Sequence, residues 1–136
     1  MLGKISVKGF KPKTAKKGKE ITKRKDELYK AFVNQNKNIV ELQEKCRGKE
    51  LSINVTFRLN ENTPDKSSYK KDLDNLLKIL LDVIKEEMDD DKKKTGLGLV
   101  IKNNDDKIFE INCNKKFVTS DDDEGIDLIV SEWKRK

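Results

Sequence analysis

Strict alternation of apolar and polar residues along residues 51–59 is the clearest structural signal in this chain. Every second residue there is Leu, Ile, Val or Phe, and the residues between them are Ser, Asn, Thr and Arg. Successive side chains of a strand point to opposite faces, so the pattern predicts a strand with one buried face. Further strands are predicted over residues 2–9, 108–118 and 126–133, and a short apolar run favours another over 96–101.

Two segments instead carry apolar residues at helical spacing. In residues 22–46 the stripe advances in steps of four and three, which predicts one helix with Thr22 as its N-cap and Gly48 just past its end. In residues 72–87 a wider stripe predicts a second helix that packs on the core. The sequence therefore predicts two long helices.

Breakers and polar residues predict the connections. Residues 10–20 are expected to form a basic loop, and residues 120–125 a hairpin-like link between the last two strands. The order is strand, helix, strand, helix and then strands. It predicts an α+β fold with a small mixed sheet in one domain spanning residues 1–136.

Charge is distributed unevenly along the chain. Residues 1–50 contain 15 Lys and Arg against 6 Asp and Glu, a balance of +9, whereas residues 51–136 contain 16 against 19, a balance of −3. The basic N-terminal part favours a polyanionic partner. Hydrophobic residues make up only 34% of the chain, which fits a thin core, long solvated helices or an oligomer.

Several function classes are excluded by composition. The chain has no histidine, which removes histidine general bases, the Ser-His-Asp triad and His-ligated zinc. Cys46 and Cys113 are far apart and are expected to be free thiols in a reducing, cytoplasmic compartment. No apolar run approaches the length of a membrane span, and the first residues lack the apolar core of a signal peptide.

The candidate chemistry lies at the start of the second predicted helix. Asp72 and Asp74 stand two residues apart, with Asn75 and Lys78 close behind. Two carboxylates there suit a divalent cation that also binds phosphate, and a lysine one turn later suits the charge that develops during phosphodiester cleavage. The structural alternatives are helix capping and an ordinary Asp74–Lys78 pair on the helix surface.

Cleavage with two metal ions requires a third acid. Asp105 and Asp106 are the candidates because they directly precede a predicted strand that could lie beside the start of this helix. Asp89–Asp91 and Asp121–Asp123 compete with them, but both runs are expected to be solvated turns.

Residues 71–78 (KDLDNLLK), followed by Leu81-Asp82 and later by Asp105-Asp106 before Ile108, resemble the motif of the RusA family of Holliday junction resolvases. The resemblance implies a homodimer that binds four-way DNA junctions and nicks two strands symmetrically in recombination and repair. It implies Mg²⁺, with Mn²⁺ as a substitute, as the cofactor.

Carried over by motif, Asp72, Asp74 and a third acid would bind metal, and Lys78 would be the catalytic lysine. The third acid would be Asp105 or Asp106, with Asp105 preferred by its position before Glu110. Lysines of the basic segment and of the motif are expected to contact the DNA backbone; they are Lys11, Lys13, Lys16, Lys17, Lys19, Lys70 and Lys71. Two alternatives stay open, namely a non-catalytic DNA-binding protein and a nuclease that cuts ordinary duplex.

Overall fold

The computed structural model describes residues 1–13, 18–62, 72–85, 96–100 and 107–135. Within them the chain forms four strands and three helices, so the predicted α+β class is confirmed, whereas the prediction of two long helices is wrong. The elements in chain order are β1 (Gly3–Lys8), α1 (Gly18–Gln35), α2 (Ile39–Cys46), β2 (Leu51–Asn60), α3 (Leu73–Ile84), β3 (Ile108–Val118), the 3-10 turn η3 (Asp121–Asp123) and β4 (Gly125–Glu132).

The strands form one mixed sheet in the order β1-β4-β2-β3. β4 is antiparallel to both β1 and β2, whereas β2 and β3 are parallel. The hairpin-like link predicted over residues 120–125 is therefore wrong, because β2 lies between β3 and β4. Burial explains this order: β4 contributes Ile126, Leu128 and Val130 to the core, whereas most side chains of β3 are exposed.

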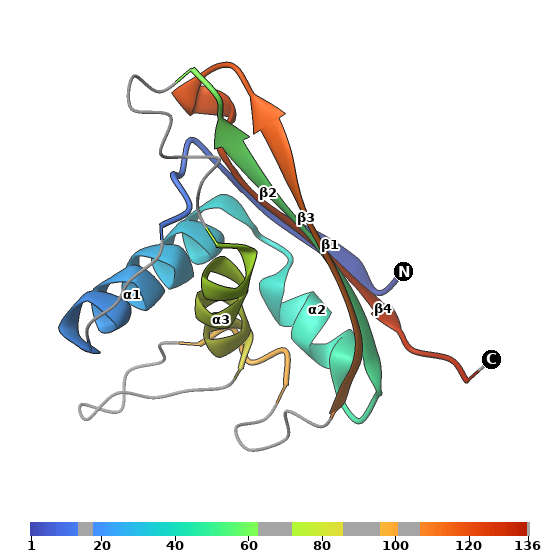
Figure 1. Cartoon of the computed structure of the whole chain (residues 1–136). Coiled ribbons are helices and arrows are strands. Elements are labelled where there is room, and N and C mark those ends of the chain that lie inside the picture. Colours follow the sequence, from blue (N-terminus) through green and yellow to red (C-terminus); the bar gives the residue numbers. More distant parts are fainter. Residues whose placement is uncertain (14–17, 63–71, 86–95, 101–106, 136) are drawn as a thin grey trace.

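The three helices lie on one side of the sheet (Figure 1). The alternating residues of β2, including Val55 and Phe57, point to this side and are buried, as predicted, against helix residues such as Phe32 and Leu80. Burying this apolar surface drives the packing of the two layers. The opposite face of the sheet is polar and carries side chains such as Asn54.

The single helix predicted over residues 22–46 is wrong. α1 ends at Gln35 and α2 begins at Ile39. The apolar stripe nevertheless continues through the break, since buried residues of both helices face the same core. α1 also begins earlier than expected, at Gly18, so Thr22 is not its N-cap but donates a hydrogen bond to the Gly18 carbonyl at 3.1 Å.

Side chains at this break close the free edge of β1. The Asn36 amide donates to the Ser6 carbonyl at 2.8 Å and accepts from the Ser6 N–H at 3.1 Å. Gln35 makes the same two contacts with Lys8, at 3.0 and 2.8 Å. These amides take the place of a neighbouring strand, which satisfies backbone groups that an edge strand otherwise exposes.

Of three smaller predictions, the one for Gly48 is confirmed and the other two are wrong. Gly48 has a positive φ of 72° just after α2, as expected for a helix C-cap glycine. α3 ends at Ile84 rather than at residue 87, because Lys85 is extended. Residues 96–100 form no strand in the described chain; they make one bridge, between Val100 and Lys85. No described helix is long and apolar enough to cross a membrane.

Candidate metal centre

Asp72 is the N-cap residue of α3, but its carboxylate does not cap the helix. Its backbone is extended and its carbonyl accepts from the Leu76 N–H at 3.2 Å, whereas its side chain forms no capping hydrogen bond. Asp74 lies in the first turn, and both acids are exposed. The positive end of the helix dipole favours these negative charges. The Asp72 side chain therefore does not act as the helix cap that the structural alternative predicts.

Asp74 and Lys78 do not form the expected surface pair. Other acids and lysines at the same spacing do pair, such as Asp26 with Lys30 at 3.0 Å. Among the described residues, neither Asp74 nor Lys78 has an ion-pair partner within 4.0 Å. The Asp74 carboxylate and the Lys78 ammonium thus remain available to a ligand at the start of α3.

Asp82, which belongs to the resembling motif, has ion-pair partners of its own. It pairs with Lys25 of α1 at 2.8 Å and with Lys85 at 3.5 Å. These contacts join α3 to α1, so the part of the motif that contains Asp82 supports the helices and does not enter the candidate site.

Strand β3 packs against α3 and passes close to Asp74. Burial is the main reason why the pKa of the Cys113 thiol is raised, and the Asp74 carboxylate raises it further. A nearby carboxylate raises the pKa of a thiol because its negative charge disfavours the thiolate. Asp74 therefore lies near Cys113. Cys113 pairs with Val55 of β2 and points to the helix side of the sheet. The predicted approach of this strand to the start of α3 is thus confirmed, but no sequence signal marked Cys113 as a neighbour.

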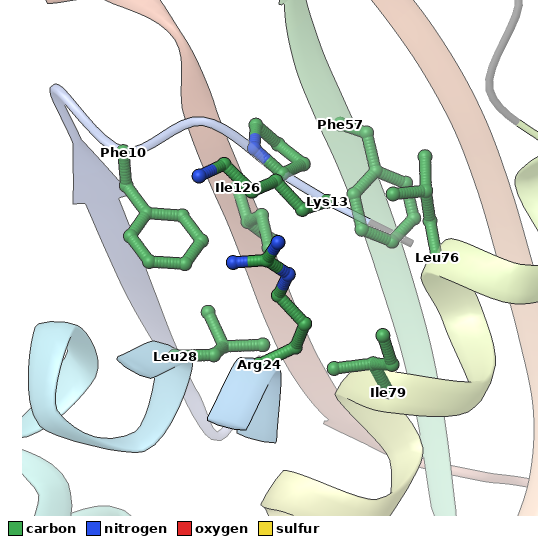
Figure 2. Close-up of a pocket in the computed structure, with 9 residues that line it drawn as sticks. Phe10, Lys13, Arg24, Leu28, Phe57, Leu76, Ile79 and Ile126 are labelled. Carbon is green, nitrogen blue, oxygen red and sulfur yellow. The ribbon is translucent and has the colours of Figure 1, made fainter. Parts of the chain in front are cut away.

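The basic segment also reaches the start of α3. Lys13 and Arg24 line an otherwise apolar hollow together with Leu76, which lies in the first turns of α3 (Figure 2). Arg24 extends into this hollow from α1 and pairs with Glu27 at 3.4 Å. Lys13 itself is exposed. A cation that was predicted to contact DNA therefore lines the same hollow as a residue from the first turns of α3.

Of the other lysines predicted to contact DNA, two lie in the described residues and four lie outside them. Lys11 lies near the η3 turn, where its charge helps to lower the pKa of Asp121, and Lys19 is exposed in the first turn of α1. Lys16, Lys17, Lys70 and Lys71 lie outside the described residues.

The third acid is not placed by the structure. Asp105, Asp106 and the competing run Asp89–Asp91 lie outside the described residues. Asp121–Asp123 is exposed, as expected, and Asn60 donates to Asp121 at 2.9 Å, which lowers the pKa of that carboxyl. In the part of the chain that is described, no three His, Cys, Asp or Glu residues form a group that could hold a metal ion.

The donor set still fits one hard cation. Mg²⁺ favours carboxylate, water and phosphate oxygens as ligands, and the carboxylates of Asp72 and Asp74 are exposed and have no ion-pair or capping partner among the described residues. Comparisons with protein-family models, with curated proteins and with solved structures found no match to this chain.

Proposed function

We propose that this protein is a Mg²⁺-dependent endodeoxyribonuclease that acts on branched DNA, as the resemblance to the RusA resolvases implies. The observation that carries the proposal is that the carboxylates of Asp72 and Asp74 are exposed and without partners among the described residues. Both lie at the positive end of α3. The helix dipole alone would favour acids here, but it would not require two exposed carboxylates with a lysine one turn later on the same face.

In this proposal each nearby residue has a distinct role. Asp72 and Asp74 would hold the cation, which supplies Lewis acidity toward the scissile phosphate when bound. Lys78, one turn along the same face, would stabilise the negative charge that grows on the phosphate oxygens. Lys13, beside Leu76, would hold the neighbouring phosphate and fix the register of the backbone. Asp105 or Asp106 would complete the cation site.

Homodimerisation belongs to the same proposal. A four-way junction presents two equivalent strands, and a two-fold dimer presents two equivalent sites, so paired symmetric nicks follow from matching symmetry. The basic balance of the first 50 residues supports binding to the phosphate backbone.

The test is cleavage of a labelled four-way junction and a matched linear duplex, with Mg²⁺, Mn²⁺ or EDTA. Wild type should nick the junction in pairs, and Asp74→Asn and Lys78→Gln should each lose about 10²-fold or more in rate. Asp26→Asn is the matched control, because this exposed carboxylate pairs with Lys30 on α1. Junction binding without cleavage under every metal would favour the DNA-binding alternative, and equal cutting of the duplex would favour an ordinary nuclease.

A further inference from the structure

The two edges of the sheet differ. The β1 edge is closed by the amides of Gln35 and Asn36, whereas no described strand pairs with the outer edge of β3, which is 11 residues long. Three large apolar side chains on β3 are exposed to solvent, namely Phe109 by 47%, Ile111 by 41% and Phe117 by 49%. A long apolar edge strand is a template for pairing with another chain.

The sequence of β3 is complementary to itself when it is reversed. In an antiparallel pair of two β3 strands with the two-fold axis at Cys113, residues whose numbers are equally far from 113 lie opposite each other. Glu110 then faces Lys116 of the second copy, and Asn112 faces Asn114. All four point to the polar face of the sheet, as their pairing with Ser52, Arg58, Asn54 and Thr56 of β2 shows.

Only this register brings the opposite charges together. Moving the axis by one residue places Glu110 opposite Asn114 or Val118 of the second copy. On the helix side, Phe117 would lie diagonally across from Ile111 of the second copy, within reach of an aromatic side chain. The charge pair and the amide pair on the polar face thus select this register, and the diagonal apolar contact on the helix side is compatible with it.

We infer that β3 pairs with β3 of a second copy of this chain, antiparallel and centred on Cys113, so that two four-stranded sheets become one sheet of eight strands. The pairing does not rest on the proposed nuclease activity. If both hold, the nearness of Asp74 to Cys113 places both acid pairs on the same face of the joined sheet and close to the axis.

Charge reversal tests the pairing. Sedimentation of wild type at low ionic strength should give twice the 15.7 kDa chain mass. Glu110→Lys and Lys116→Glu each place like charges opposite each other, so each should weaken dimerisation at least tenfold. The double variant Glu110→Lys/Lys116→Glu should restore the dimer, which a merely damaged fold would not do. Lys4→Glu, an exposed reversal on the opposite edge strand, should remain dimeric.

Cross-linking tests the register. In Cys46→Ala protein a short bismaleimide should join two chains through Cys113, and the product should disappear in Lys116→Glu. A wild type that stays monomeric at all accessible concentrations, or a dimer that ignores both reversals, would overturn the inference. These readouts measure mass and not cleavage, so an inactive protein that still pairs would reject only the nuclease proposal.

Discussion

Arg58 occupies the space where a side chain at Gly125 would lie. A Cβ on Gly125 would stand 2.7 Å from Nη2 of Arg58 and 1.9 Å from the Val7 carbonyl oxygen. The guanidinium needs this approach, because it donates to the carbonyls of Val7 and Asp123, each at 2.6 Å. Arg58 of β2 thereby joins β1 to the η3 turn across the start of β4.

Gly125→Ala should therefore destabilise the fold by about 3 kcal/mol or more, since the added methyl group meets backbone that cannot move aside. Urea unfolding measures the loss. Gly18→Ala is the control, because nothing lies within 4 Å of a Cβ there, and it should unfold like wild type. A Gly125→Ala protein as stable as wild type would show that Arg58 and Val7 can relax.

Asn36→Ala should cost about 1–3 kcal/mol and make the protein prone to aggregation. It removes the amide that donates to and accepts from Ser6 and leaves the backbone groups of β1 without those partners. Denaturant unfolding and light scattering measure the two effects. Asn54→Ala, on the exposed face of β2, should change neither. An Asn36→Ala protein that stayed clear and equally stable would mean that solvent satisfies this edge.

Asp74→Asn should lower the pKa of Cys113, because it removes a negative charge that disfavours the thiolate. Alkylation of Cys113, followed by mass spectrometry near pH 8, should then be faster. Saturating Mg²⁺ should have the same effect on wild type and none on Asp74→Asn, since a bound cation offsets the carboxylate. Asp82→Asn serves as control because Asp82 faces Lys25. An Mg²⁺ response that persisted in Asp74→Asn would remove Asp74 from the metal site.

Cys46 should make the protein sensitive to alkaline pH. Burial raises the pKa of its thiol from 9.0 to about 11. The folded state therefore retains a proton that the unfolded state loses, and the free energy of unfolding falls as the pH rises above 9. The stability advantage of wild type over Cys46→Ala should shrink between pH 9 and 11, by up to ~3 kcal/mol. If urea unfolding showed the same difference in stability between wild type and Cys46→Ala across this range, the raised pKa of Cys46 would be contradicted.

The sequence predicted the strands well because each carries its own signal. Alternation in residues 51–59 places every apolar side chain of β2 on the helix side. The break between α1 and α2 leaves no comparable mark, because the stripe continues through it and only the contacts of Asn36 with Ser6, 30 residues away, reveal it. The position of β4 beside β2 was also hidden, since strand order depends on which strands can be buried.

At the candidate site, too, the sequence predicted what depends on local spacing and missed what depends on contacts between distant segments. The placement of Asp72 and Asp74 at the start of α3 followed from local spacing. Their lack of partners among the described residues, and the nearness of Asp74 to Cys113, depend on the register of β3 against β2 and on the packing of α3. Sequence spacing carries no information on such contacts between distant segments.

The amides of Gln35 and Asn36 have a consequence for the proposed pairing of two chains. A sheet with two open edges can add copies without limit and grow into a fibre. Here one edge is occupied by the chain's own side chains, so any growth by strand addition must stop once β3 has found its partner. The break in the helix layer would thus make the assembly self-limiting, with two chains as its natural end point.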